Sequence, residues 1–329
     1  MENKKKYLLI IDGNALVHRS YHALPPLTTK KGELINAIYG FLLVFFKTVK
    51  ELQPDFIAAT FDLPFPTFRH QKFKAYKATR PKTPDELCRQ FPKLKEILRA
   101  FNIPIFEKKG FEADDLIGAI AKLARQKQAF PKVETIILTG DLDTLQLINS
   151  QTKVSTFKKG IKESILYDEE KVKERYQGLT PKQLPDFKAL KGDPSDNIPG
   201  VPGVGEKTAI KLIKEFGSLE NLYQYIEQIK IPRKSTSKKE EICVNPRLLA
   251  VLKDYKEQAF FSKMLTTIQR DVPIEFNLKN CHWQDYNRQK VGQVLKKLEF
   301  HSLLSRLPSP GAESSVLKGH LDKKEISKE

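Results

Sequence analysis

The chain has 329 residues, and its 57 Lys and Arg against 40 Asp and Glu leave a formal net charge of +17. An excess of this size indicates an anionic partner, while 40% hydrophobic and 29% charged residues are typical of a globular protein and exclude a disordered chain. The three cysteines form no Cys-x-x-Cys pair, which excludes a disulfide framework and a thiolate zinc site. No apolar run reaches the ~20 residues of a membrane span, so we expect a soluble, cytoplasmic protein.

Three short apolar runs predict buried β-strands, and each leads to an aspartate. The runs are residues 7–11, 56–61 and 135–139, and the aspartates are Asp12, Asp62 and Asp141. Helical patterns lie between the runs, for example over residues 35–52, and this alternation predicts an α/β fold with a mostly parallel sheet. Ligands of such sheets bind outside the carboxyl ends of the strands, so we expect the three aspartates to share a site.

Further acids follow the same pattern. Taken singly, each group has an ordinary structural explanation, because acids in a first helical turn complement the helix dipole and Asp favours turns. Converging carboxylates, however, repel one another by several kcal/mol unless cations neutralise them, which indicates Mg²⁺ or Mn²⁺. An acidic site in a basic chain favours a nuclease with two metal ions about 4 Å apart. The candidate metal ligands are Asp12, Asp62, Glu112, Asp114, Asp115, Asp141, Asp143, Asp193 and Asp196.

One basic segment, residues 69–82, carries six Lys and Arg and no acid, with aromatic residues between them. This mixture suits a surface that follows a nucleic-acid backbone and offers aromatic rings for stacking. The candidate contacts are Arg69, Lys72, Lys74, Tyr76, Lys77, Arg80 and Lys82. A second basic stretch, residues 230–239, is rich in Ser and Thr and is more typical of a solvated loop.

From about residue 178 the pattern becomes helical over residues 181–190 and 206–216, with a glycine-rich turn at 200–205 between them, which predicts a second, helical subdomain. The turn at Gly203 and Gly205 does not match a P-loop, because Glu206 separates it from Lys207 and Thr208. Backbone N–H groups at such a turn can bind a nucleic-acid phosphate whatever the base sequence, with the Lys and Thr side chains close by. The alternative is an ordinary corner between two helices.

Seven motifs resemble, in the same order, those of the bacterial 5′ nucleases, the 5′–3′ exonuclease domains of DNA polymerase I in the flap endonuclease superfamily. They are Ile10-Ile-Asp-Gly13, Thr60-Phe-Asp62, Phe68-Arg-His70 with Tyr76-Lys77 and Arg80, Glu112-Ala-Asp-Asp115, Thr139-Gly-Asp-Leu-Asp143, Gly192-Asp-Pro-Ser-Asp-Asn197 and Gly203-Val-Gly-Glu-Lys-Thr-Ala209. The resemblance covers about residues 6–307. It implies a PIN-like core over residues 1–176 with a helical arch at about 64–100, a DNA-binding subdomain with a helix-three-turn-helix motif over 177–307, and a disordered tail over 308–329.

The resemblance also implies roles for single residues. Asp12, Asp62, Glu112, Asp114 and Asp115 correspond to a first metal cluster, and Asp141, Asp143, Asp193 and Asp196 to a second. Lys77 and Arg80 correspond to catalytic arch residues that contact the scissile phosphate. The glycine turn would hold the downstream duplex, and its carbonyls could bind K⁺. One departure is Leu142, which stands where the family usually has Lys.

The function that the resemblance implies is a structure-specific 5′–3′ exonuclease and flap endonuclease, which hydrolyses DNA by a two-metal mechanism in primer removal and DNA repair. The expected partners are DNA with a free 5′ end or flap, RNA–DNA primers and a DNA polymerase acting in trans, and a monomer is expected. Two alternatives stay open: a catalytically silent protein that binds branched DNA, and a PIN-like ribonuclease. None of the nine expected acids is missing, which disfavours the silent protein.

Overall fold

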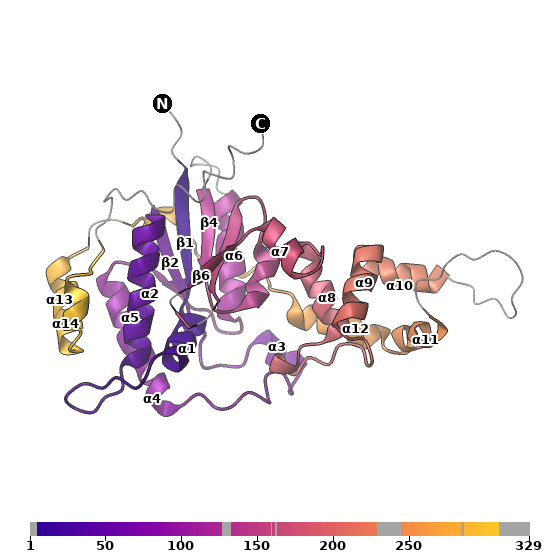
Figure 1. Ribbon diagram of the computed structural model, residues 1–329, viewed down its shortest axis with the longest axis horizontal. Helices are drawn as coiled ribbons and strands as arrows, with labels where there is room; N and C mark the ends of the chain where they lie inside the picture. Colours follow the sequence, from indigo (N-terminus) through magenta and orange to yellow (C-terminus); the bar gives the residue numbers. More distant parts are fainter. Residues whose placement is uncertain are drawn as a thin grey trace, which may run out of the picture.

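The computed structural model describes residues 5–126, 133–158, 160–161, 163–228, 245–283 and 286–308. The interpretation of residues 230–239 as a loop lies outside the described residues, and so does that of residues 308–329 as a disordered tail, except for Pro308, whose carbonyl accepts a hydrogen bond from the hydroxyl of Tyr286 at 2.6 Å. Within them, no helix is long and apolar enough to cross a membrane. Figure 1 shows a body built around one sheet, with a group of helices extending away from it.

The sheet has six strands in the order β3-β2-β1-β4-β5-β6, and its first five strands run parallel while β6 is antiparallel to β5. The strands are β1 (Lys6–Asp12), β2 (Phe56–Thr60), β3 (Ile105–Phe106), β4 (Val133–Leu138), β5 (Thr152–Phe157) and β6 (Ser164–Tyr167). The predicted mostly parallel sheet is confirmed, and the three predicted strands are its central ones. Of the others, β3 escaped prediction because it has two residues, and β5 because four of its six side chains are polar.

The central strands are mostly apolar because both of their faces are covered. Leu9 and Ile11 of β1 point into a core shared with one group of helices, and Leu8 and Ile10 point into a core on the opposite face. The first group consists of α1 (Gly13–Ala23), α2 (Asn36–Leu52) and α5 (Gln90–Ala100), and the opposite face is covered by α6 (Ala113–Gln126). Because successive side chains of one strand point to opposite faces of the sheet, the same strand packs against both layers of helices.

In the range predicted as an arch, residues 64–100, only the last part is a long helix. It holds α3 (Phe68–Lys72) and α4 (Asp85–Cys88), and the chain between them has no helix (Figure 1). The last part of the range is α5, whose Leu94 and Ile97 are fully buried against the sheet. Helix α5 thus belongs to the core, and the part that stands away from the sheet ends before it.

The extended group of helices, called here the helical arm, has its own hydrophobic core, which includes Phe187, Ile213 and Leu252. The predicted helix over residues 206–216 is present with the same bounds. The arm consists of α8 (Leu184–Lys191), α9 (Glu206–Phe216), α10 (Leu219–Gln228), α11 (Pro246–Asp254) and α12 (Lys256–Thr266), and α7 (Glu169–Arg175) with a short turn at Pro181–Gln183 leads into it.

After α12 the chain returns to the sheet, so residues 177–307 pack in two places rather than in one subdomain. The returning part contains a 3₁₀ turn (Leu278–Cys281), α13 (Arg288–Lys297) and α14 (His301–Leu304). Trp283 lies against Phe45 with ring centroids 6.1 Å apart, and its backbone N–H donates to the carbonyl of Asp55 at 2.7 Å. Val291 and Leu295 of α13 are fully buried in the same core.

We predict that Trp283→Ala lowers the free energy of unfolding by about 3–5 kcal/mol, because it leaves a cavity where the returning segment meets α2 and α5. Denaturant unfolding followed by circular dichroism measures the change. Tyr255→Ala is the control, since this aromatic side chain is 38% exposed and its removal should change the free energy by less than about 1 kcal/mol. Equal effects of the two variants would contradict the assignment of the returning segment to the core.

Candidate active site

The carboxyl ends of β1, β2 and β4 meet at one edge of the sheet, where Asp12 is held at the end of the central strand. One oxygen of Asp12 accepts a hydrogen bond from the backbone N–H of Ala15 at 2.9 Å and so caps α1. The other accepts from the hydroxyl of Thr139, just after β4, at 2.6 Å. The strand order changes direction between these two strands, which is the position where open α/β sheets bind ligands.

The two other strand-end aspartates are fixed by backbone donors. Asp62, after β2, accepts a hydrogen bond from the backbone N–H of Ala113 at 2.7 Å, which joins it to the start of α6. Asp141 caps the 3₁₀ turn Leu142–Leu147 by accepting from the backbone N–H of Asp143 at 2.8 Å. Each side chain is thus oriented by its own local cap, and the predicted convergence at the sheet edge is present.

Asp115, predicted as a metal ligand, is saturated with hydrogen bonds instead. Its two oxygens accept from the guanidinium of Arg69 at 2.8 and 2.9 Å and from the backbone N–H groups of Glu112 and Gln269 at 3.1 and 2.8 Å. The side chain is fully buried. The structure therefore gives Asp115 the task of anchoring Arg69, and no open oxygen faces the other acids.

Arg69 itself was predicted to contact DNA, and this prediction is wrong in the structure. The residue is 2% exposed, and besides Asp115 it donates to the carbonyls of Leu265 and Thr267 at 2.8 and 2.9 Å. A buried guanidinium with this many acceptors is a structural link. It joins α3 to α6 and to the end of α12.

Tyr76 was predicted as a stacking platform, and it too is buried, with 4% of its surface exposed. Its hydroxyl lies 3.1 Å from Glu112 and 3.2 Å from Asp196, so it is held between the two acids. The neighbouring Phe73 packs against Phe261 of α12. A sequence pattern shows that aromatic and basic residues alternate, but not which of them the fold covers. Lys72, Lys74 and Lys82 are exposed, as a DNA contact requires.

Lys77 and Arg80, the predicted catalytic residues, do reach the acids. The Lys77 amine donates to Glu112 at 2.9 Å and lies 3.9 Å from Asp196, and the Arg80 guanidinium forms an ion pair with Asp196. Burial opposes the charge of Lys77, but the two carboxylates outweigh it and raise its pKa. Lys77 has a φ of +56°, an uncommon backbone conformation that costs free energy and occurs mostly at functional sites.

Sequence reasoning missed Lys188 of α8. Its amine pairs with Asp143 and lies 2.7 Å from Asp193. Burial raises the pKa of Asp193, but Lys188 and a hydrogen bond from Ser195 outweigh this and lower it. The only available signal was the spacing of five residues between Lys188 and Asp193. Leu142, in the position where Lys was expected, packs against the core.

The turn that carries Asp193 and Asp196 depends on two glycines. A Cβ on Gly200 would lie 2.2 Å from the backbone nitrogen of Gly192, so the two ends of the turn touch directly. Gly192 has a φ of +79°, which favours glycine. This close approach and the paired backbone hydrogen bonds between Asp193 and Ile198 close the loop, and they bring both aspartates back toward α8.

The acids form one electrostatically connected group, called here the carboxylate cluster. Burial and the charges of Asp141 and Asp62 raise the pKa of Asp12 to about 7, although two hydrogen bonds oppose the change. Burial, Asp141 and Asp193 raise the pKa of Asp143 to about 6, against the effect of Lys188. Burial and the neighbouring acids also raise the pKa of Asp114 well above its ordinary value. The cluster consists of Asp12, Asp62, Glu112, Asp114, Asp141, Asp143, Asp193 and Asp196.

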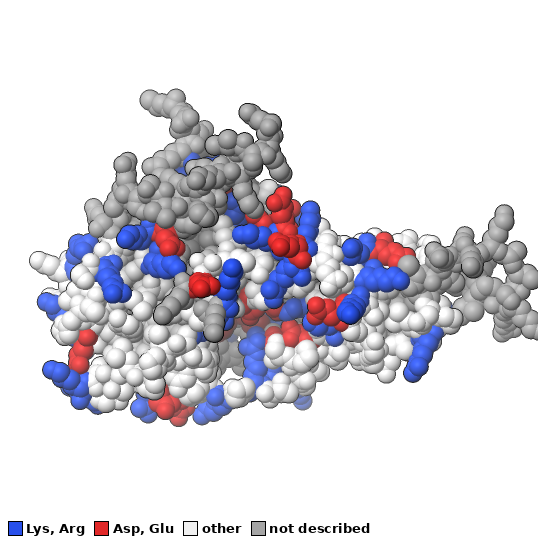
Figure 2. Space-filling view, in the orientation of Figure 1, with Lys and Arg blue, Asp and Glu red and all other residues white. Residues whose placement is uncertain are grey.

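The donor chemistry of the cluster fits divalent cations. As the side chains stand, no group of three or more His, Cys, Asp or Glu within the described ranges is arranged to hold a metal ion, and Lys77, Arg80 and Lys188 lie among the acids. The cluster nevertheless offers only hard oxygen donors, and their raised pKa values show that the carboxylates lack sufficient positive charge. Figure 2 shows acidic side chains between the body and the helical arm, bordered by Lys and Arg.

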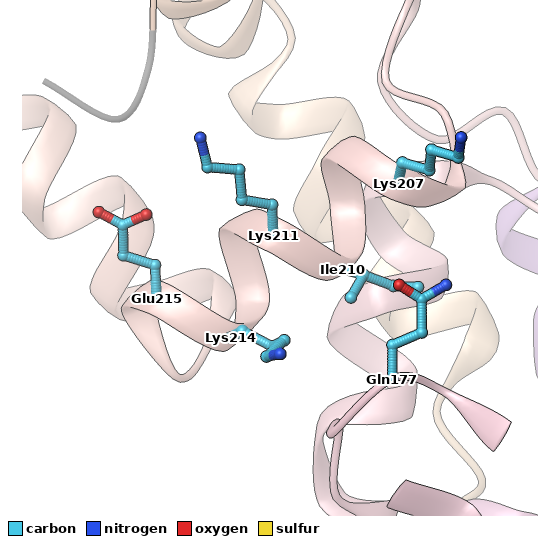
Figure 3. Close-up of a pocket in the computed structure, with 6 residues that line it drawn as sticks. All are labelled: Gln177, Lys207, Ile210, Lys211, Lys214 and Glu215. Carbon is cyan, nitrogen blue, oxygen red and sulfur yellow. The ribbon is translucent and has the colours of Figure 1, made fainter. Parts of the chain in front are cut away.

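The glycine turn lies at the start of α9 and is open. A Cβ on Gly203 or Gly205 would meet no heavy atom within 4 Å, so a ligand could approach this backbone closely. Lys207 is followed on α9 by Lys211 and Lys214, which the sequence analysis did not select although they recur at helical spacing. Figure 3 shows the three lysines around a hollow of about 390 Å³. All three are exposed.

The raised pKa of Asp12 has a predictable effect on stability. The pKa of an ordinary aspartate is near 4, and that of Asp12 in the folded chain is about 7. At pH values between the two, Asp12 keeps its proton in the folded chain and loses it in the unfolded chain. Without divalent ions, this carboxyl makes the free energy of unfolding fall as the pH rises through that range. Asp12→Asn should therefore melt at a higher temperature than the wild type at pH 8 in EDTA, and the difference should shrink toward pH 4.

Thermal unfolding followed by circular dichroism from pH 4 to 8 tests this. Asp271→Asn is the control because its side chain is 82% exposed and it should keep the pH dependence of the wild type. A constant difference between Asp12→Asn and the wild type at every pH would contradict a raised pKa for Asp12.

Comparisons with known proteins agree with this geometry. A family model described as "5'-3' exonuclease, N-terminal resolvase-like domain" matches residues 7–177, and a second, "5'-3' exonuclease, C-terminal SAM fold", matches residues 179–289. DNA polymerase I of Bacillus caldotenax is 42% identical over 309 residues, which are 94% of this chain and 33% of the polymerase. The chain thus spans about a third of the length of that relative.

Solved structures show the same fold. A flap endonuclease of bacteriophage T5 in complex with DNA and metal ions has a TM-score of 0.61 at 22% identity and covers 89% of this chain and 100% of its own. The catalytic core of Rad2 in complex with a DNA substrate has a TM-score of 0.58 at 16% identity and covers 92% of this chain and 93% of its own. Since the two family models together match most of the chain, this protein belongs to the 5′–3′ exonuclease family.

Proposed function

We propose that this chain is a structure-specific 5′–3′ exonuclease and flap endonuclease that hydrolyses DNA phosphodiester bonds with the help of divalent metal ions. The observation that carries the proposal is the carboxylate cluster at the carboxyl ends of β1, β2 and β4, with the amine of Lys77 2.9 Å from Glu112. Acids of the cluster are in contact with the cationic side chains of Lys77 and Arg80. This arrangement suits an anionic substrate that binds together with metal ions. The DNA-bound relatives of the same fold support DNA as that substrate.

The residues that would hold the metal ions belong to the cluster. We assign Asp12, Asp62, Glu112 and Asp114 to one site and Asp141, Asp143, Asp193 and Asp196 to the other. Mg²⁺ or Mn²⁺ at such sites supplies positive charge for the phosphate and lowers the pKa of bound water. Asp115 is not among the ligands, because Arg69 and two backbone donors occupy its oxygens.

Lys77 and Arg80 act on the phosphate in this proposal. Both pair with acids of the cluster. A scissile phosphate that lay between the acids and the segment 73–84 could accept hydrogen bonds from both side chains. Lys77 is positioned in advance, because its backbone N–H donates to the carbonyl of Asp196 at 3.0 Å. An oriented cation stabilises the charge that develops on the phosphate without having to be reorganised.

The open glycine turn and the lysine row of α9 would bind the duplex beside the cleavage site. Lys214 follows Lys207 by seven positions on the helix, a distance of about 10 Å along the axis at 1.5 Å per residue. This is the length of a few phosphates of one strand, which are spaced about 3.4 Å apart along the duplex axis. Gly203, Gly205 and Thr208 complete this surface, and K⁺ at the turn carbonyls is part of the proposal.

In the cell, this activity would remove primers and repair flaps, in line with the polymerase I relatives. The substrates would include RNA–DNA primers as well as DNA with a free 5′ end, and a DNA polymerase would act with the nuclease, in trans or in the same polypeptide. We propose a monomer that works in the cytoplasm.

Cleavage of 5′-labelled flap DNA and of matched RNA, each with Mg²⁺ and with EDTA, tests the function. The wild type should cut the DNA near the junction only with Mg²⁺, and Asp114→Asn should cut it at least about 100-fold more slowly because one metal site loses a charged ligand. Asp271→Asn should cut at the wild-type rate. Binding of flap DNA without any cleavage would favour the silent protein, and cleavage of RNA alone would favour the ribonuclease.

A second prediction concerns the lysine row. Replacing both Lys211 and Lys214 by Ala should weaken duplex binding and reduce the slope of log affinity against log salt by about 1–2, since each lost phosphate contact removes about 0.9. Fluorescence anisotropy at salt concentrations from about 50 to about 200 mM measures both the affinity for duplex and its salt dependence. The matched control replaces Lys296 and Lys297 of α13, which lies at the far end of the molecule (Figure 1). An unchanged slope for the α9 variant would contradict the proposed duplex surface.

A further inference from the structure

Phe65 is an exposed aromatic residue that no role assigned so far explains. Among the described residues, the exposed large hydrophobic side chains are Leu27, Phe65 and Tyr255, and Phe65, at 49%, is the most exposed of them. A single exposed apolar side chain is common on protein surfaces and requires no function by itself. The location and the surroundings of Phe65 distinguish it.

The loop that carries Phe65 borders the carboxylate cluster. At its start, Asp62 accepts a hydrogen bond from the backbone N–H of Ala113 at 2.7 Å, and at its end, the N–H of Phe68 donates to the carbonyl of Gly110 at 2.9 Å. Both ends are therefore fixed to the segment that carries Glu112. Phe65 follows Asp62 by three residues, so its backbone lies within about 10 Å of that acid.

The loop is also rigid. Pro64 and Pro66 flank Phe65 and restrict its backbone, and the N–H of Phe65 donates to the carbonyl of Leu63 at 2.8 Å. An aromatic ring on a restricted backbone has little conformational freedom to lose when a ligand contacts it. This lowers the cost of using the ring as a binding surface.

A lysine accompanies the ring. The amine of Lys109 lies 5.1 Å from the ring centroid of Phe65, a distance at which a cation is attracted to the face of an aromatic ring. Lys109 is exposed, and Lys108 precedes it in the same loop. An aromatic face beside a positive charge matches the two parts of a nucleotide, a flat base and a phosphate.

We propose that Phe65 is a stacking platform for an unpaired base next to the cleavage site, and that Lys109 contacts a phosphate of the same strand. This inference rests on the proposed function and adds a residue that positions the strand. A protein partner fits the surface less well, because an interface requires an apolar patch of hundreds of Å² whereas a base needs one ring. Tyr76 is buried and the partly buried Phe73 packs against Phe261, which leaves Phe65 to fill the stacking role that the sequence pattern had assigned to Tyr76.

The test compares flap DNA with flap DNA whose unpaired nucleotides nearest the junction are abasic, which keeps the phosphates and removes the bases. Binding is measured in EDTA by fluorescence anisotropy. Phe65→Ala should bind the normal flap about tenfold more weakly than the wild type, while Phe65→Trp should keep the affinity. On the abasic flap, the wild type and Phe65→Ala should bind equally, because neither has a base to stack.

Tyr255→Ala is the matched control, since it removes another exposed aromatic side chain and should leave both affinities unchanged. Equal binding of the normal flap by the wild type and Phe65→Ala would overturn the inference, as would the same loss on both flaps. If the wild type bound the flap but left it uncut in Mg²⁺, only the proposed function would fail. If the wild type did not bind the flap, both would fail.

Discussion

The gathering of acidic side chains at one edge of a parallel sheet, where burial and mutual repulsion disfavour their charge, is the constraint on which the rest of this structure depends. The pKa of Asp12 rises to about 7 because burial and neighbouring acids destabilise its charge. Such a cluster persists only where the fold is stabilised elsewhere, here by two apolar layers on the faces of the central strands. The strain is concentrated where a positively charged ligand would relieve it.

Besides Lys77, the chain meets this constraint with three cations that differ in purpose. Arg69 is buried and permanently bound to Asp115, so it fixes α6 relative to the helical arm. Lys188 neutralises the acids on the arm side, between Asp143 and Asp193. Arg80 is about half exposed, and in the proposed function it exchanges its acid for the substrate phosphate. The net charge of +17 therefore does not describe a uniformly basic surface, because several of the Lys and Arg side chains pair with acids inside the protein.

Much of the site could be predicted from the sequence, because the patterns that place its acids are formed by neighbouring residues in the chain. A fully apolar run followed by Asp indicates a buried parallel strand with an acid at its carboxyl end, and Asp12 and Asp62 follow from this pattern. Arg69 and Tyr76 could not be placed this way. Their residue types suit DNA, and only the packing of α12 against the segment 69–76 shows that both are buried.

The sequence by itself determined the three central strands, the acids at their ends, the bounds of α9 and the family, since each depends on residue type at short spacing. Only the tertiary structure decided which charges pair and which side chains remain open to a substrate. Lys188 and Asp143 are 45 residues apart, and Arg69 and Leu265 are 196 apart. Hydrogen bonds and burial over such separations depend on how the arm and the sheet pack, and that packing leaves Phe65 exposed beside the site while it covers Tyr76.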